Sequence, residues 1–334
     1  MHRRLLVLMA LAIVTTAGVV ALIGQAAHFG KLVHQLDQAE FGWLLVCALG
    51  QLISYAGYVL CYQAIARLSD GPRIPMPVVL RVIFLAFGAF SVASTIGGLS
   101  VDFWVLREAG EPADRASARV IALETLRWAL LAAVTCIASV LILAGVADRP
   151  PWGVAVGWLV VTPACFLAAR WFSVPARSQR FTTGTGILRR ALAVAVRALV
   201  YLRELAGSPA SLRARAVLGA AGFWAGEILC AWAALQAFDA HVGVVPLVVG
   251  YSTGLLSEMI PLPAGGAGGV DAALTGGFAL AGVPLSSALL AAVTFRVFTF
   301  WLPAVLALTS VVTVGGLRRR LKEVAATRGA EAGT

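Results

Sequence analysis

Long stretches without a charged residue constrain this 334-residue chain more than any other feature. A helix that crosses the hydrocarbon core of a bilayer, roughly 30 Å thick, needs about 20 apolar residues. Several uncharged runs reach that length, and only 13% of all residues are charged. The sequence therefore predicts an all-α polytopic membrane protein. The uncharged runs are 5–30, 41–66, 82–101, 128–147, 150–169, 272–295 and 297–317.

The first uncharged run follows the basic start MHRR. It is longer than the roughly 7–15 residues typical of the apolar core of a cleaved signal peptide, and no convincing cleavage site follows it. We therefore interpret it as a transmembrane helix. The five cysteines lie widely spaced in apolar segments and form no C-x-x-C pattern, so we predict neither a disulfide framework nor a metal site, and we expect no cofactor.

The formal net charge of +10 raises the question of a nucleic-acid partner. We expect none, because the arginines border hydrophobic runs instead of forming a soluble basic face. Cytoplasmic flanks of membrane spans are enriched in Lys and Arg. This rule predicts that both termini lie in the cytoplasm. The basic clusters are Arg3 with Arg4, Arg67 with Arg73, the 170–215 stretch, and 318–322.

Placing the basic clusters in the cytoplasm also predicts the topology. Two segments, 77–110 and 246–282, must each enter and leave the membrane by one face if the other segments are to keep their orientations. We therefore predict two re-entrant hairpins from opposite faces. The first is expected to break at Gly97 and Gly98, and the second in the stretch PLPAGGAGG. Six full crossings are expected at about 5–24, 41–66, 116–145, 152–170, 215–238 and 284–316.

Equal spacings relate the two halves of the chain. A proline, an aspartate and an arginine recur at 25-residue intervals: Pro77, Asp102 and Arg127, then Pro246, Asp271 and Arg296. Each half then contains three crossings and one hairpin, and an odd number of crossings inverts one half relative to the other, as in many secondary transporters. The expected division is repeat 1 over 1–147, repeat 2 over 148–317 with a basic cytoplasmic linker at 171–214, and a cytoplasmic tail at 318–334.

The linker carries Arg190, Arg197 and Glu204 seven residues apart, on one stripe of a helix. A helix lying against anionic lipid at the cytoplasmic surface fits this pattern. A solvated connector helix fits it equally well.

The glycine-rich stretch at 261–274 forms the first part of the predicted site. Non-helical backbone at membrane depth is tolerated where protein or a water-filled cavity supplies hydrogen-bond partners. Prolines break the incoming helix, glycines permit unusual backbone angles, and the amides that begin the return helix suit an anionic group. A tight elbow for helix packing is the alternative. The expected site residues here are Pro263, Gly265, Gly266, Gly268 and Asp271.

Charged side chains inside the apolar runs form the second part. Each costs about 2.5–3.5 kcal/mol on insertion scales, so such groups are expected to share partners or face water. The two arginines lie about 12 residues into their spans, and a guanidinium at that depth can bind a phosphate through two hydrogen bonds. Acids outnumber bases here, and we hypothesise that some acids are protonated or face a cation. The charged candidates are Asp102, Glu124, Arg127, Glu227, Glu258, Asp271 and Arg296.

Structural roles compete with ligand binding at these positions. The two aspartates are also suited to capping the return helices. Glu124 and Arg127 are three residues apart and suited to pairing on one helix face. Glu227 is expected to hydrogen-bond a neighbouring helix, and we leave it outside the predicted binding site. Arg296 has no acid nearby in its own span, so it most needs a distant partner or a ligand.

The stretch from 261 to 303 resembles a motif of the lysylphosphatidylglycerol synthase transmembrane-region family, which are flippase-like integral membrane proteins. The family pattern is P-x-P-G-G-x-G-x-x-E, followed by R-x-x-x-(F/Y)-W-x-P, and the resemblance extends over nearly the whole chain. The sequence departs from the pattern at Ala264, where the family often has Pro, and at Asp271, where it often has the longer Glu. The matching residues are Pro261, Pro263, Gly265, Gly266, Gly268, Arg296, Trp301 and Pro303.

The resemblance implies lipid handling without aminoacyl transfer, since this sequence carries no soluble synthase domain. We expect a lipid flippase or lipid transporter of the bacterial inner membrane, not an enzyme. It is expected to move phospholipid or glycolipid headgroups through a polar cavity near the midplane, with the anionic headgroups of membrane lipids as its partners. The glycine amides and both arginines are expected to bind phosphate, while Asp102, Glu124, Glu258 and Asp271 manage protons or an amine. A secondary transporter of a small solute, with or without proton coupling, is the alternative. An intramembrane enzyme is disfavoured, because the sequence offers no metal motif or credible nucleophile.

Overall fold

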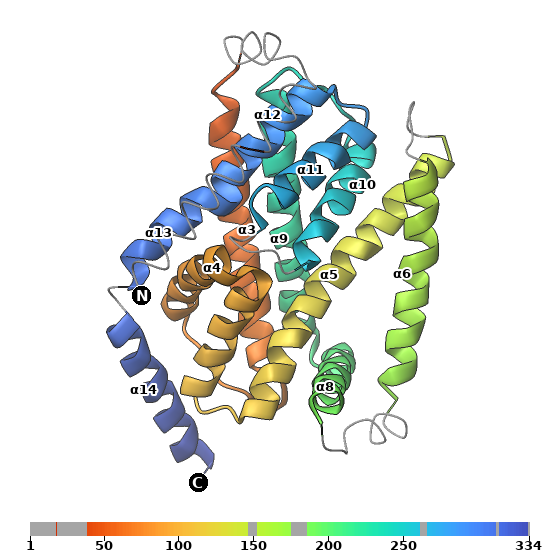
Figure 1. The fold of residues 1–334 in the computed structure, drawn as a ribbon. Helices are drawn as coiled ribbons and strands as arrows, with labels where there is room; N and C mark the ends of the chain where they lie inside the picture. The colour runs from red at the N-terminus through yellow and green to blue at the C-terminus, as the bar shows by residue number, and fades with distance from the viewer. Residues whose placement is uncertain are drawn as a thin grey trace.

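The structure is a computed structural model, and it describes residue 18 and residues 39–145, 152–174, 186–260, 266–311 and 314–332. Within these residues all regular secondary structure is helical (Figure 1). The α-helices are α3 (Trp43–Ala66), α4 (Met76–Glu108), α5 (Ala113–Leu143), α6 (Trp152–Phe172), α8 (Ile187–Gly207), α9 (Ala210–Gln236), α10 (Val244–Leu255), α11 (Gly269–Leu280), α12 (Leu285–Arg296), α13 (Leu302–Val311) and α14 (Val314–Ala332). Three short elements join them: the 3₁₀ turns η1 (Leu68–Asp70) and η2 (Leu256–Met259), and the π-helical η4 (Val297–Trp301).

Five of the described helical segments are long and apolar enough to cross a membrane. They confirm the predicted class, an all-α polytopic membrane protein, and they fall on five of the six expected crossings. The expected crossing at 5–24 lies outside the described residues. The five segments are Trp43–Ala66, Ala113–Leu143, Trp152–Phe172, Ala210–Gln236 and Leu285–Ala307.

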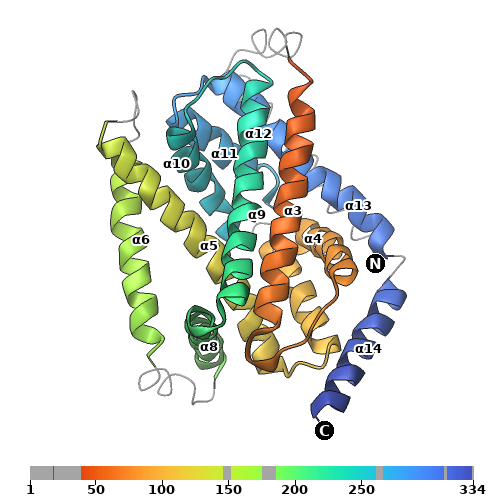
Figure 2. The ribbon, with the colours of Figure 1, turned by 180° about the vertical axis from the view of Figure 1, so that it is seen from behind.

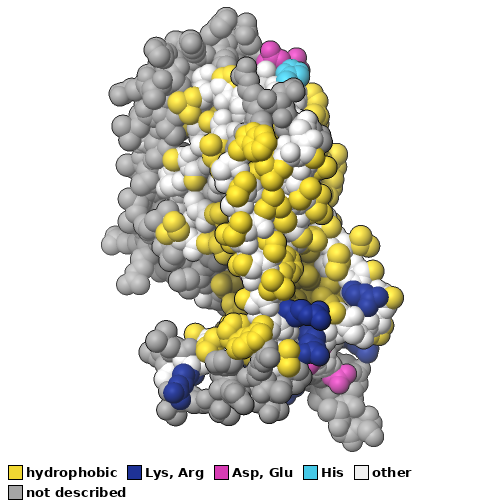
Figure 3. Space-filling view, turned by 90° about the vertical axis from the view of Figure 1, so that its right-hand side faces the viewer, with side chains coloured by type: hydrophobic (Ala, Val, Ile, Leu, Met, Phe, Trp, Pro, Cys, Tyr) yellow, Lys and Arg dark blue, Asp and Glu magenta, His cyan; other side chains and the backbone are white. Residues whose placement is uncertain are grey.

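The outer surface supports the same conclusion. Figure 3 shows a broad hydrophobic face, with basic side chains gathered at its lower end and acidic and histidine side chains at its upper end. Helix α6 contributes exposed apolar side chains such as Val156, Val160 and Leu167. A continuous apolar surface of this kind is costly in water and suits contact with lipid.

Helices α3 and α9 pack side by side along their length (Figure 2). Glycines bring the two backbones together, because a Cβ atom on Gly57 would lie 2.3 Å from the backbone nitrogen of Phe223. A Cβ atom on Gly226 would lie 2.3 Å from the carbonyl oxygen of Gly50. Small residues at helix contacts are how membrane helices approach this closely. Helices α4, α5, α8, α10 and α12 pack against this pair.

Helix α4 folds back on itself between its ends. A straight helix of its 33 residues would be about 50 Å long. Both of its ends nevertheless lie beside α14. Near the C-terminal end of α4, Glu108 forms an ion pair with Arg318 at 3.0 Å. Near its N-terminal end, Val78 lines a surface pocket together with Glu323 and Thr327 of α14. The segment therefore leaves and rejoins the same end of the molecule (Figure 1). The expected break at Gly97 and Gly98 is wrong, because both glycines lie within helix.

Helices α10 and α11 form a second hairpin. A Cβ atom on Gly250 would lie 2.2 Å from the carbonyl oxygen of Gly277, and one on Gly254 would lie 2.7 Å from that of Ala273. These pairings run in opposite directions along the two helices, so α10 and α11 are antiparallel. The chain thus turns between them, within the segment 246–282, as expected. The prolines and the first glycine of the predicted break, 261–265, lie outside the described residues.

Candidate functional site

The second half of the chain builds a buried charge cluster around Arg296. Its Nε donates a hydrogen bond to Asp271 Oδ1 at 3.0 Å, and the side chains of this pair are only 3% and 1% exposed. Its Nη1 lies 3.5 Å from Glu258 Oε1, and its guanidinium lies 4.3 Å from the centre of the Phe300 ring. The sequence predicted that this arginine needs a distant partner, and the structure supplies two acids from separate elements.

Local backbone geometry explains how Asp271 reaches this position. Gly266 and Gly268 adopt φ angles of +73° and +83°, a region that other residues disfavour, and they lead directly into α11. Asp271 Oδ2 then accepts a hydrogen bond at 2.8 Å from the backbone N–H of Gly268. The expected capping role is confirmed for this aspartate. One carboxylate oxygen holds the helix end, and the other binds Arg296.

The first half builds a related cluster around Arg127. Its Nη1 donates to Glu124 Oε1, so the pairing expected from their spacing is confirmed. Its guanidinium lies 3.7 Å from the centre of the Phe223 ring and 5.1 Å from that of Tyr58. The Tyr58 hydroxyl donates to Asp102 Oδ2 at 2.7 Å. Tyr58 therefore contacts both the aspartate and the arginine.

The two clusters have the same composition but different bonding. Each contains one arginine, one aspartate and one glutamate, which gives each a formal charge of −1. In the second half, Arg296 binds Asp271 directly. In the first half, Asp102 lies among helical residues of α4 and bonds to a tyrosine. A capping role for Asp102 is therefore wrong, because it occupies the interior of a helix.

Aromatic side chains connect the two clusters. The indole N–H of Trp224 donates to the carbonyl oxygen of Arg127 at 2.6 Å, and its ring lies 6.5 Å from that of Tyr251. The Tyr251 ring lies 5.7 Å from that of Phe295, the residue before Arg296. The clusters are therefore linked through side chains of α9 and α10.

Glu227 occupies a separate position on α9. Its Oε1 accepts hydrogen bonds from Gln51 Nε2 and Ser54 Oγ, both at 3.0 Å, and its Oε2 lies 3.5 Å from the Tyr251 hydroxyl. The expected hydrogen bond to a neighbouring helix is confirmed, with partners on α3 and α10.

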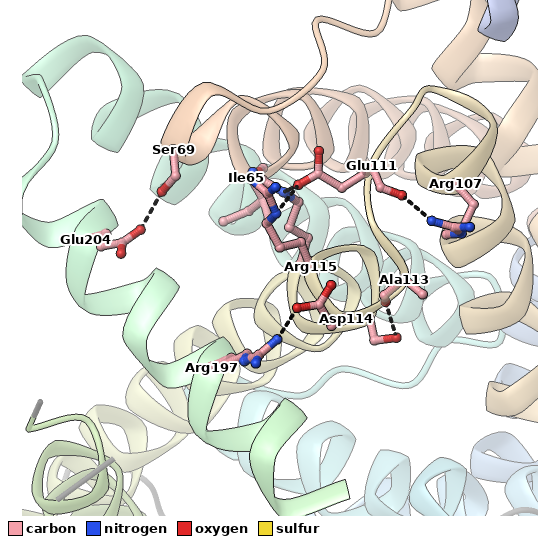
Figure 4. A network of polar contacts seen from close by, with 11 residues as sticks. Ile65, Ser69, Arg107, Glu111, Ala113, Asp114, Arg115, Arg197 and Glu204 are labelled. Atoms are coloured by element: carbon pink, nitrogen blue, oxygen red, sulfur yellow. Dashed lines mark hydrogen bonds and ion pairs between the residues drawn. The ribbon is translucent and has the colours of Figure 1, made fainter. Parts of the chain in front are cut away.

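Sequence analysis missed a third charged cluster, at the end of the molecule near α8 (Figure 4). Arg119 Nε lies 3.1 Å from Glu111 Oε1, and both side chains are almost completely buried. Arg119 Nη1 also donates to the carbonyl oxygen of Ile65 at 3.0 Å, and Arg107 donates to that of Glu111 at 2.8 Å. These bonds fix the end of α3, the end of α4 and the start of α5 together.

Helix α8 docks on this cluster. Arg197 binds Asp114, and Ser69 donates to Glu204 at 2.5 Å (Figure 4). The Arg119 guanidinium lies 4.9 Å from the centre of the Tyr201 ring. The linker helix is therefore packed against the bundle on this side.

The structure thus places most predicted site residues in two neighbouring clusters. Gly266, Gly268 and Asp271 start the return helix beside Arg296 and Glu258, while Asp102, Glu124 and Arg127 form the other cluster. Pro263 and Gly265 lie outside the described residues.

Fold and site together define a multi-pass helical membrane protein with paired arginine and acid clusters in its core. Comparison with known families is consistent with that class. The family model for the lysylphosphatidylglycerol synthase TM region matches residues 7–307, so the chain belongs to that family. A search of curated proteins finds no match. The family supports a lipid-related or flippase-like role in the membrane.

Proposed function

We propose that this protein moves the headgroup of a phospholipid or glycolipid between the leaflets of a bacterial inner membrane. The observation that carries the proposal is the pair of buried clusters, each of which joins a folded-back segment to a full span. A charge in a membrane interior costs about 2.5–3.5 kcal/mol, and such residues generally mark transport routes. Family membership independently favours lipid as the cargo.

The proposed arrangement in the membrane follows from the ends of the molecule. Helix α14 carries Arg318, Arg319, Arg320 and Lys322 and lies beside both ends of α4. The positive-inside rule assigns this end to the cytoplasm, together with both termini. Helix α4 is then a re-entrant hairpin from the cytoplasmic face, and α10 with α11 is one from the opposite face. The two halves form an inverted repeat.

In the proposed mechanism, the arginines exchange partners with the lipid. Arg127 and Arg296 release an acid and bind the headgroup phosphate, which matches a guanidinium in charge and geometry. The released acids, among them Asp102, Asp271 and Glu258, then take up protons or an amine of the headgroup. Each cluster has a formal charge of −1, so binding an anionic phosphate brings it to −2, and uptake of two positive charges, as protons or an amine, makes it neutral. Binding and release of lipid require no covalent chemistry, and we propose a transporter.

A dithionite-quenching assay tests the proposal. Proteoliposomes with fluorescent lipid are expected to expose inner-leaflet lipid faster than empty vesicles, and Arg296→Ala is expected to slow this exposure. Arg296→Lys keeps the charge and serves as a folded comparison. Arg197→Ala, which removes an ion pair with 40% and 56% exposed side chains, is the matched control and is expected to keep the wild-type rate. A wild-type rate equal to that of empty vesicles, or an unchanged rate in Arg296→Ala, contradicts the proposal.

The matched clusters also favour a second candidate function, secondary transport of a small solute, because inverted halves are common in such transporters. Thermal stabilisation by a soluble solute, with no effect of added lipid, is the result that selects this candidate.

A further inference from the structure

Glu227 is a buried acid that the proposed lipid route does not use. It is 8% exposed and lies where α9 meets α3 and α10. Its carboxylate accepts hydrogen bonds from the neutral side chains of Gln51, Ser54 and Tyr251, and the positive charge of Arg127 acts on it from further away. Among the described residues, no Lys, Arg or His forms an ion pair with it. An ionised carboxylate in this position is costly unless a cation or a proton neutralises it.

Three donors, from Gln51, Ser54 and Tyr251, point at the two carboxylate oxygens of Glu227, and one buried acceptor beside them has no partner. Gln51 is only 4% exposed, and its Oε1 has no hydrogen-bond partner, although its Nε2 binds the carboxylate. A half turn of this amide exchanges its oxygen and nitrogen without changing its shape. Oxygens of Glu227, Gln51, Ser54 and Tyr251 then face one another, and hard cations prefer such oxygen ligands.

The backbone around these oxygens is held firmly. Gly50 precedes Gln51 and Gly226 precedes Glu227, and these two glycines form one of the closest contacts between α3 and α9. A ligand set carried by helices in direct backbone contact is preorganised, so binding a cation costs little ordering of the protein.

We propose that Glu227, Gln51, Ser54 and Tyr251 form a binding site for a monovalent hard cation, Na⁺. A single carboxylate neutralises a single positive charge, whereas a divalent ion leaves an uncompensated charge in the core. The ion joins α10 to α3 and α9, and α10 continues through η2 to Glu258 beside Arg296. Occupation of the site therefore holds the second hairpin against the centre of the bundle. This inference does not depend on which molecule the protein transports.

Thermal unfolding of the purified protein in sodium-free, non-ionic detergent tests the site. NaCl is titrated against choline chloride and KCl at constant ionic strength and constant pH. A ligand that binds only the folded state raises stability with the logarithm of its concentration above its Kd. We expect Na⁺ to raise the unfolding midpoint by about 3 °C or more, with no comparable effect of choline. Binding of radioactive ²²Na⁺ is expected to reach one ion per chain.

Variants separate this site from a general effect of salt. Glu227→Gln keeps the shape of the side chain but removes its charge, and it is expected to abolish both the sodium response and ²²Na⁺ binding. Tyr251→Phe removes one ligand oxygen and is expected to weaken binding several-fold, which gives a second test if Glu227→Gln does not fold. Ser252→Ala is the control, since Ser252 is the neighbouring residue but bonds to Thr135, and it is expected to respond like the wild type.

Three results overturn the inference. One is equal stabilisation by choline or K⁺, and another is ²²Na⁺ binding that persists in Glu227→Gln. The third is that lowering the pH stabilises the wild-type protein whereas Na⁺ does not. Glu227 is then a site for a proton and not for Na⁺. None of these results bears on lipid translocation, which the dithionite assay measures separately.

Discussion

Replacing Arg296 with leucine removes the guanidinium that Asp271 and Glu258 share. Breaking a buried ion pair by removing one partner costs about 3–5 kcal/mol, because the remaining charge stays buried. Exposed pairs contribute only about 0–1 kcal/mol. The side chains of Arg296 and Asp271 are 3% and 1% exposed, which places this pair in the buried class. At about 2 °C per kcal/mol for a chain of this length, we expect Arg296→Leu to lower the unfolding midpoint by about 6–10 °C.

A double-mutant cycle isolates the ion pair from other effects of the leucine. Asp271→Asn removes the charge but keeps an oxygen that can accept the hydrogen bond from Gly268. The double variant is expected to be more stable than the sum of the two single losses predicts, by about 2 kcal/mol or more, because each single variant already loses the same Arg296–Asp271 ion pair. Unfolding is followed by tryptophan fluorescence in lipid nanodiscs. A midpoint change below about 2 °C in Arg296→Leu, or losses that simply add, refutes the reasoning.

Three further predictions concern packing and the other polar contacts, and thermal unfolding in the same nanodiscs checks each of them. Gly250→Val is expected to destabilise the α10–α11 contact strongly, since a Cβ atom there would lie 2.2 Å from a backbone oxygen. Gly276→Ala is the control: a Cβ atom at this position would have no atom within 4 Å, so the substitution is expected to be neutral or slightly stabilising. Arg119→Met is expected to lower the free energy of unfolding by about 3–5 kcal/mol, because both side chains of the Arg119–Glu111 ion pair are buried. Arg115→Ala is expected to lower it by less than about 1 kcal/mol, because the Arg115 side chain is exposed. Equal losses in the two variants would contradict this difference. Tyr58→Phe is expected to cost about 1–3 kcal/mol, because it removes a hydrogen bond to a buried carboxylate while keeping the ring, and an unchanged midpoint would contradict that role.

The membrane class and most crossings could be predicted from the sequence, because apolar length is a direct requirement of the bilayer. Expected crossings at 41–66 and 152–170 correspond closely to α3 and α6. Both segments that the orientation argument singled out contain a reversal of the chain, and their re-entry into the membrane stays a prediction. The sequence could not predict the local form of the first one, since Gly97 and Gly98 are tolerated within a helix and do not force a break there.

The candidate site was predictable only in part. The 25-residue spacing from Asp271 to Arg296 marks a direct contact, but the same spacing in the first half does not, because Tyr58 bonds to Asp102 instead. The spacing between two residues cannot show that a tyrosine from another helix binds one of them. Arg119 was missed because it lies near the start of a span, where arginines are ordinarily exposed. Its one signal was a position between apolar residues, in the stretch ARVIAL.

Cysteine accessibility tests the central claim, that two folded-back segments enter the membrane from opposite faces. Single cysteines are introduced at the exposed positions 73 and 113, which flank α4, and at 241 and 285, which flank α10 and α11, in a background without the five native cysteines. A membrane-impermeant maleimide is applied to intact cells and to inverted vesicles. The account predicts that 73 and 113 react from the cytoplasmic side and that 241 and 285 react from the other side. Reaction of the two members of either pair from opposite sides would contradict it.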